Sequence, residues 1–206
     1  MLVEILPGNI DQRLIKEAVD YLRNGNILIF PTDTVYAMGC DLNNKKALNS
    51  LAQLKGQKLN KVNFSILCHD LSNLSDYVRN IDRPTFKTLK LNLPGPFTFI
   101  LKANTEVPKL FDSKKKEIGI RIPDNAITLA LIKELGNPIA TTSLHDSEDM
   151  LLDYFTDPYQ IFERYDDIRE VGMIIDGGIG QLTASTIVDC TLGDTQIVRQ
   201  GIGVLK

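Results

Sequence analysis

The sequence lacks the features of a membrane or secreted protein. No run of roughly 18 apolar residues occurs in the chain, which predicts that no helix crosses a membrane. Residues 1–7 carry neither a basic start nor a small-residue cleavage site, so we expect no signal peptide. Cysteine is scarce: Cys40, Cys68 and Cys190 lie far apart, without a Cys-x-x-Cys pair. This spacing argues against a zinc site and a disulfide framework, and it favours the cytoplasm.

Two common nucleotide-binding signatures are also missing. The chain has no Gly-x-x-x-x-Gly-Lys-Ser/Thr, and no Gly-x-Gly-x-x-Gly after a strand. The glycines of 177–180 and 201–203 have a different spacing and predict turns. No Ser-His-Asp or Cys-His arrangement is evident, which argues against a covalent nucleophile. A nucleotide bound by this chain would therefore be held without a P-loop.

The net charge of −3 hides an uneven distribution. Residues 45–121 hold 15 of the 23 lysines and arginines but only 6 of the 26 acidic residues. Such a local excess predicts a basic surface that meets phosphate, either of a nucleotide or of an RNA. The alternative is a solvated charged face, above all for the three consecutive lysines at 114–116.

Strands alternate with helices along the chain, which predicts an α/β fold. The apolar content of 43% is sufficient for a core, and no repeat or linker is present, so we expect one domain over residues 1–206. The strand-rich last third predicts a mixed sheet. Residue spacing predicts helices between 11 and 24 and at 44–55, 71–78, 82–92 and 125–135, and strands at 27–30, 64–68, 97–102, 118–122, 139–143, 171–175, 185–189 and 196–199.

The most informative segment is 27–40, with the sequence ILIFPTDTVYAMGC. Its four leading apolar residues indicate a buried strand, which Pro31 ends. Thr32, Asp33 and Thr34 follow at the carboxyl end of that strand, where ligands of open α/β sheets usually bind. The alternative is that these three residues cap a following helix.

This segment resembles the PTDTVYGLG signature of the YrdC-like family, the threonylcarbamoyl-adenylate synthases of the tRNA modification threonylcarbamoyladenosine. Further matches follow in the order found in that family: LPGPFTF at 93–99, GIRIP at 119–123, STIVD at 185–189 and RQG at 199–201. The segments 63–72 and 142–144 resemble the YciO branch of the family. Together these motifs extend the resemblance over nearly all of the chain.

The resemblance implies a twisted, open, mixed sheet flanked by helices, with a concave basic face. It also implies an ATP-dependent nucleotidyltransferase. In that reaction L-threonine and bicarbonate form a carbamate, which attacks the α-phosphate of ATP to give threonylcarbamoyl-AMP and pyrophosphate. Mg²⁺ would arrive with ATP as part of the substrate, with no tightly bound cofactor and no dedicated metal site. Double-stranded RNA or tRNA is a further expected partner, and the oligomeric state stays open.

Arg121 is the strongest single candidate for a functional residue. On a strand at 118–122, Gly119 and Arg121 face one side, opposite three isoleucines. We expect the glycine to leave open space beside the guanidinium, which suits a carboxylate or phosphate received by two hydrogen bonds. The alternative is an edge arginine that pairs with a nearby carboxylate of the protein. The resemblance implies that Arg121 contacts the substrate threonine.

The resemblance assigns other residues to the two ligands. Thr141 and Ser143 lie two apart, so both hydroxyls project from one face of a strand. Each of these residue types also has a purely structural explanation. Hydroxyls at strand ends more often form hydrogen bonds with neighbouring backbone groups. A lysine at the end of a helix is favoured by the helix dipole, and an arginine on an edge strand can protect against aggregation. The resemblance implies a catalytic role for Lys55 and Arg121, threonine binding by Thr34, Arg121, Thr141 and Ser185, and nucleotide binding by Lys55, Gln57, Asn63, Ser143, His145 and Arg199.

Three positions depart from the synthases. Gln57 replaces an arginine, His145 replaces an asparagine, and Cys68 stands where the synthases have a histidine. Losing one aimed charge can reduce a rate by about 10²–10³. These departures keep open a second hypothesis, a non-catalytic protein that binds a nucleotide or double-stranded RNA on the same fold. The acidic residues at 146–149 beside His145 invite a metal site, but their spacing is not diagnostic of one.

Overall fold

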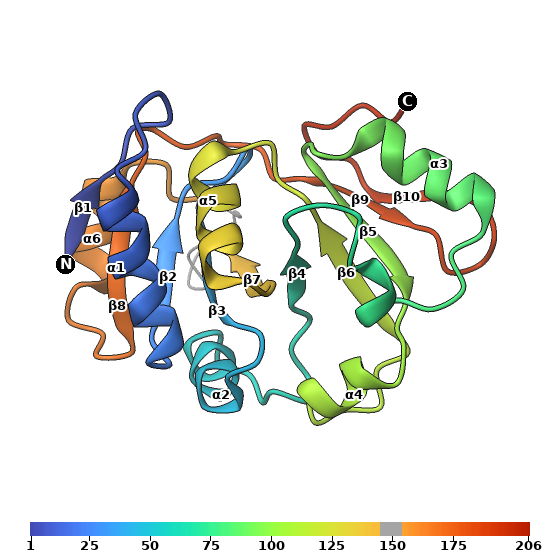
Figure 1. The fold of residues 1–206 in the computed structure, drawn as a ribbon, viewed down its shortest axis with the longest axis horizontal. Helices are drawn as coiled ribbons and strands as arrows, with labels where there is room; N and C mark the ends of the chain where they lie inside the picture. The colour runs from blue at the N-terminus through green and yellow to red at the C-terminus, as the bar shows by residue number, and fades with distance from the viewer. Residues whose placement is uncertain (145–153) are drawn as a thin grey trace.

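A mixed sheet of ten strands runs through this computed structural model, which describes residues 1–144 and 154–206 (Figure 1). The strand order is β1-β8-β2-β3-β7-β4-β6-β5-β9-β10, and the sheet is open, with β1 and β10 at its two edges. The strands are β1 (Leu2–Glu4), β2 (Ile27–Phe30), β3 (Ala37–Asp41), β4 (Ser65–Leu67), β5 (Phe97–Lys102), β6 (Glu117–Arg121), β7 (Ile139–Ser143), β8 (Val171–Asp176), β9 (Thr186–Asp189) and β10 (Gln196–Arg199).

Parallel and antiparallel pairs are interspersed in this sheet. The pairs β1–β8, β8–β2, β4–β6 and β5–β9 are parallel, and the other five pairs are antiparallel. The helices are α1 (Gln12–Arg23), α2 (Lys45–Leu54), α3 (Arg83–Asn92), α4 (Glu106–Leu110), α5 (Ala126–Leu135) and α6 (Pro158–Tyr165), with a 3-10 turn η1 at Leu74–Asp76. The expected open, mixed α/β sheet is therefore confirmed. Among the described residues, no helix is long and apolar enough to span a membrane.

Helices cover both faces of the sheet, and alternation along the strands explains how. Leu28 and Phe30 of β2 share a buried cluster with apolar residues of α1 and α5. Ile27 and Ile29 join the cluster on the other face, which includes residues of α2 and α6. Because successive side chains of a strand point to opposite faces, the continuous apolar run at 27–30 serves both layers. In Figure 1, α1 and α5 lie side by side in front of the left half of the sheet.

Several predicted elements are confirmed where the local chemistry was decisive. The Asp11 carboxylate accepts a hydrogen bond from the backbone N–H of Arg13 and so caps α1. Gly136 ends α5 in the left-handed conformation that glycine adopts without strain. The helix expected at 71–78 is wrong, because only the short turn η1 forms there.

The interpretation of Thr32, Asp33 and Thr34 as a helix cap is also wrong. The chain turns back after Pro31 and forms β3, which is antiparallel to β2. The Thr32 hydroxyl closes this turn: it accepts a hydrogen bond from the Thr34 N–H at 3.1 Å and donates one to the Val35 carbonyl at 2.7 Å. These local bonds pair the Thr34 N–H and the Val35 carbonyl within the turn, without a helix.

Candidate functional site

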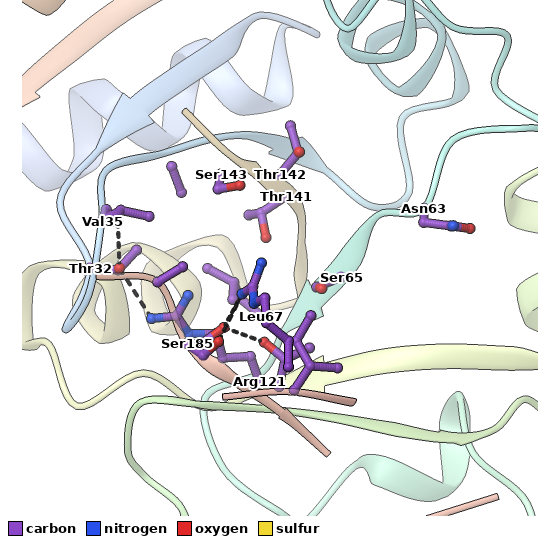
Figure 2. A pocket seen from close by; sticks show the side chains of 15 residues that line it. Thr32, Val35, Asn63, Ser65, Leu67, Arg121, Thr141, Thr142, Ser143 and Ser185 are labelled. Atoms are coloured by element: carbon purple, nitrogen blue, oxygen red, sulfur yellow. Dashed lines mark hydrogen bonds between the residues drawn. The ribbon is translucent and has the colours of Figure 1, made fainter. Parts of the chain in front are cut away.

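A polar pocket of about 160 Å³ lies where the middle strands of the sheet meet the segment that follows β2 (Figure 2). Seven strands, β3, β4, β5, β6, β7, β9 and β10, contribute to its lining, together with residues that precede β3, β4 and β9. This volume is smaller than the roughly 300–1,000 Å³ typical of pockets for drug-sized ligands. The enclosed part therefore suits a small molecule or one end of a larger one.

Arg121 lies at the end of β6 and points toward the turn after β2. Its Nη2 donates to three oxygens of one tripeptide: Asp33 Oδ1 at 2.5 Å, Thr34 Oγ1 at 2.6 Å and Thr32 Oγ1 at 3.2 Å. The Arg121 side chain is 10% exposed and that of Asp33 is 8% exposed, so this ion pair is largely removed from water. The alternative weighed for Arg121, a pair with a carboxylate of the protein, is thus present in the structure.

The expectation that Gly119 leaves open space beside Arg121 is wrong. A Cβ atom at Gly119 would lie 2.9 Å from Ser65 Oγ and 3.1 Å from Thr98 Cγ2. The glycine instead lets these two side chains approach the strand. Both residues line the pocket, and the space beside Gly119 is filled by the Ser65 hydroxyl from β4 and the Thr98 methyl group from β5.

A second group of hydroxyls comes from β7. Thr141 and Ser143 share one face of that strand, as their spacing predicts, and both line the pocket (Figure 2). Thr142 lines it as well. Thr141 is paired across the sheet with Ser65 of β4, which brings the two polar side chains into one wall.

The opposite wall is formed around β9 and β10. Ser185 Oγ lies 2.9 Å from Thr98 Oγ1, and both residues are buried. Arg199 Nη2 donates to the Ser185 carbonyl oxygen at 2.7 Å and lies 3.5 Å from its hydroxyl. Arg199 thereby fixes the backbone of Ser185 while its guanidinium remains at the pocket.

Not every predicted site residue lies in this pocket. Thr34 is fully buried behind Arg121 and is not among the lining residues, whereas Asn63 is exposed and lines the rim. Lys55 ends α2 and Gln57 follows it, and neither lines the pocket. Lys55 is half-buried, and this burial lowers the pKa of its ammonium group. His145 and the acidic residues 146–149 lie outside the described residues.

Asp33 is a site residue that the sequence-based assignment missed. Its signal was present, since a carboxylate between two threonines at the carboxyl end of a buried strand is well placed to contact a ligand-binding group. The missing information was the partner. Arg121 lies 88 residues away in the sequence, and only the sheet order brings it to Asp33.

The pocket has fewer positively charged side chains than the basic segment 45–121 predicts. Of the 15 lysines and arginines in that segment, only Arg121 lines the pocket, and Asp33 offsets its charge. Within residues 1–144 and 154–206, Arg199 is the other lining cation. No carboxylate lines the pocket among the described residues, and those residues hold no cluster of three metal-ligating side chains. Such a set of hydroxyls and two guanidinium groups suits an anionic or zwitterionic ligand.

The chain that forms this pocket is similar to known proteins over nearly its whole length. A family model described as Telomere recombination, Sua5_yciO_yrdC, matches residues 20–201. The protein YciO of Escherichia coli (strain K12) is 38% identical over 203 residues, which is 98% of this chain and 96% of that protein. The crystal structure of E. coli YciO matches with a TM-score of 0.88 and 37% identity, over 99% of this chain and 97% of that one.

Two longer relatives carry names that indicate a reaction and a ligand. Threonylcarbamoyl-AMP synthase of Mus musculus is 31% identical over 185 residues, covering 89% of this chain and 61% of that protein. The structure of P. abyssi Sua5 complexed with L-threonine matches with a TM-score of 0.86 and 25% identity, over 98% of this chain and 57% of that one. This chain thus spans about three fifths of the length of either relative.

Proposed function

This chain belongs to the Sua5/YciO/YrdC family, and we propose that it catalyses an ATP-dependent reaction of the threonylcarbamoyl-AMP synthase type. The substrates are L-threonine, bicarbonate and ATP, and the products are threonylcarbamoyl-AMP and pyrophosphate. The strongest support is convergence: Arg121, Thr141, Ser185 and Arg199 come from separate regions of the sequence and line one pocket. Two relatives, a mouse synthase and a Sua5 complexed with L-threonine, connect this scaffold to that reaction and that amino acid.

The proposed reaction has two steps that need positioning rather than a covalent nucleophile. The ammonium group of L-threonine first loses a proton; the resulting amine nitrogen then attacks the carbon of bicarbonate, and the carbamate forms with release of water. A carbamate oxygen then attacks the α-phosphorus of ATP, the bond between the α-phosphorus and its bridging oxygen breaks, and pyrophosphate leaves. Holding the two reactants in contact and stabilising the developing negative charge supply most of the acceleration in such reactions.

The pocket residues have distinct roles in this proposal. Arg121 receives the threonine carboxylate, and the hydroxyls of Thr141 and Ser185 orient the rest of the amino acid. Thr34 acts on the threonine indirectly, because its hydroxyl accepts a hydrogen bond from Arg121 Nη2. An amino acid is a reasonable match for a cavity of about 160 Å³, whereas ATP must extend beyond it.

The nucleotide therefore belongs at the open side of the pocket. Asn63 and Ser143 reach its rim, and Arg199 supplies a cation there. Lys55 and Gln57 do not line the cavity, and in this proposal they contact the polyphosphate end of ATP. Because no carboxylate lines the pocket among the described residues, Mg²⁺ would be held mainly by the phosphates with which it arrives.

The test is pyrophosphate release from ATP, Mg²⁺ and bicarbonate, measured with L-threonine, with L-serine and without an amino acid. We expect release that depends on L-threonine and that falls at least tenfold in Arg121→Lys, since lysine offers no planar two-donor fork to a carboxylate. Release that is equal with and without L-threonine would contradict the proposal. Full activity in Arg121→Lys would contradict the role given to Arg121.

A second function, binding of a nucleotide or double-stranded RNA without turnover, is favoured by one observation. Gln57, which stands in the place of a synthase arginine, is exposed and brings no charge. A titration of wild-type protein with ATP and with a short RNA duplex distinguishes the two functions. Binding of either ligand without threonine-dependent pyrophosphate release would support the second function.

A further inference from the structure

Arg121 and Asp33 form only half of the ion pair that their side chains can make. Among the described residues, two buried side-chain polar atoms have no hydrogen-bond partner, and they are Arg121 Nε and Asp33 Oδ2. These two atoms belong to one ion pair, in which Asp33 Oδ1 already accepts from Arg121 Nη2. The Nε–H and one Nη2–H of an arginine point the same way and match the two oxygens of a carboxylate. The missing bond is therefore the second arm of this fork.

The cause of the incomplete fork lies in the crowding at Nη2. This nitrogen carries two hydrogens but has three oxygen acceptors within 3.2 Å, from Thr32, Asp33 and Thr34. A ligand carboxylate that binds the end of the guanidinium needs a hydrogen from Nη2 as well as one from Nη1. It can obtain that hydrogen only if one of the three protein oxygens gives it up.

We propose that Asp33 is a positioning residue that completes its fork with Arg121 when a ligand carboxylate binds. Asp33 Oδ2 then accepts from Nε, Oδ1 keeps one Nη2 hydrogen, and the other hydrogen passes from the threonine hydroxyls to the ligand. Asp33 does not line the pocket and acts through Arg121, so it sets the orientation of the guanidinium without touching the ligand. The role deepens the proposed function, since L-threonine is the carboxylate that the function requires.

The test separates the carboxylate of the ligand from the rest of it. Calorimetric titrations compare L-threonine with L-threoninol, in which a hydroxymethyl group replaces the carboxylate. In Asp33→Asn one oxygen remains for Nη2, but an NH₂ group would face Nε–H, so the fork cannot close. We expect L-threonine affinity to fall about 10- to 100-fold, the range for losing a hydrogen bond to a charged group, with L-threoninol unaffected.

Two further variants control this comparison. Asp33→Glu restores both carboxylate oxygens and should recover part of the lost L-threonine affinity. Asp70→Asn removes an exposed carboxylate that pairs with His69 away from the pocket, and it should bind both ligands as wild type does. Equal weakening of L-threonine and L-threoninol in Asp33→Asn would indicate a general structural role and overturn the proposal.

A spectroscopic readout tests the same fork without relying on affinity. The Nε–H signal of Arg121, identified by its loss in Arg121→Lys, should exchange more slowly with solvent when L-threonine or acetate is added, and this slowing should vanish in Asp33→Asn. Acetate separates the two proposals, because it is a carboxylate without an amine. Slowing by acetate but no binding of L-threonine would support the role of Asp33 and contradict the synthase function. An unchanged Nε–H signal with a bound carboxylate would overturn the role of Asp33.

Discussion

The Tyr36 hydroxyl donates a hydrogen bond to the carbonyl oxygen of Gly178, at 2.7 Å, and accepts one from the Gly177 N–H, at 3.1 Å. The ring of Tyr36 is fully buried, and a Cβ atom at Gly180 would lie 2.8 Å from its Cδ2 atom. Tyr36 thereby joins the segment that leads into β3 to the chain that leaves β8. Because Thr34 lies two residues before Tyr36, this contact also fixes the acceptors of Arg121.

We predict that Tyr36→Phe destabilises the protein by about 1–3 kcal/mol, because two part-buried hydrogen bonds, to the Gly178 carbonyl and from the Gly177 N–H, are lost together. The free energy of unfolding from urea titration measures this loss. Tyr159→Phe is the matched control, since Tyr159 is 65% exposed, and it should change stability by less than about 0.5 kcal/mol. A wild-type midpoint for Tyr36→Phe would contradict the prediction.

The difference in stability between wild type and Tyr36→Phe should also depend on pH. Burial raises the pKa of Tyr36 to about 12, whereas the phenol of an unfolded chain ionises near 10. The folded state therefore favours the protonated phenol, and its contribution is complete below about pH 10 and is lost as the pH rises toward about 12. Phenylalanine cannot ionise, so the stability difference between wild type and Tyr36→Phe should shrink over this range. A difference that stays constant up to pH 12 would argue that the phenol is not protected by burial.

A substitution of Gly201 should also lower the stability of the protein. A Cβ atom there would collide with the carbonyl oxygen of Ala184 and the backbone of Ser185, both of which belong to residues of the pocket. Gly201→Ala should cost about 1–3 kcal/mol, as overpacking of a rigid site does. It should also weaken ligand binding, because Ser185 must shift. Gly8→Ala, where nothing lies within 4 Å of the added atom, should leave both thermal stability and binding unchanged.

The sequence predicted those elements whose signal is local. α1 was predicted from an acidic cap and a helical spacing of apolar residues, and β2 from a continuous apolar run. It missed β3, because Ala37–Asp41 contains a glycine and no β-branched residue. α4 was missed because Pro108 interrupts a segment of only five residues. In both cases burial against the rest of the sheet outweighs weak intrinsic preference.

The candidate site was predicted in its parts but not in its arrangement. Thr141 and Ser143 could be placed on one face because strand geometry alternates. The crowding at Gly119 could not be foreseen, since Ser65 and Thr98 reach it from two neighbouring strands. Nor could the pairing of Asp33 with Arg121, which depends on the order of strands in the sheet. Side-chain chemistry can be read from sequence, whereas contacts between distant strands require the fold.

The three thiols should differ in reactivity. Cys40 and Cys68 are buried, and burial raises the pKa of both thiols, that of Cys68 to about 12. Cys190 is half-buried, so reagent can reach it, although burial raises its pKa as well. At pH 8 we expect Ellman's reagent to modify only Cys190 in the native protein and all three thiols in denaturant. Cys190→Ser should abolish the native reaction, and rapid loss of a second thiol would refute the burial argument.

Arg199 should affect one ligand and not the other. Arg199 is exposed and lines the pocket, and the nucleotide is proposed to bind beside it. Arg199→Gln keeps a donor for the Ser185 carbonyl but removes the charge, so ATP affinity should fall about tenfold or more with L-threonine affinity unchanged. Arg169→Gln, at an exposed position that does not line the pocket, is the control. Equal losses for both ligands would indicate that Arg199 acts by holding Ser185 in place and not on the nucleotide.

Gln57 gives the sharpest test of whether this scaffold is a weakened synthase. Gln57 is exposed, so Gln57→Arg should alter stability by no more than about 0.5 kcal/mol. If the missing arginine charge limits turnover, Gln57→Arg combined with His145→Asn should raise threonine-dependent pyrophosphate release by up to about 10²–10³, the worth of one aimed charge. Gln53→Arg, an equal charge on an exposed position of α2, should not raise it. No gain in the double variant, with ATP still bound, would indicate that the absent charge is not what separates this chain from the synthases, and it would favour the binding function.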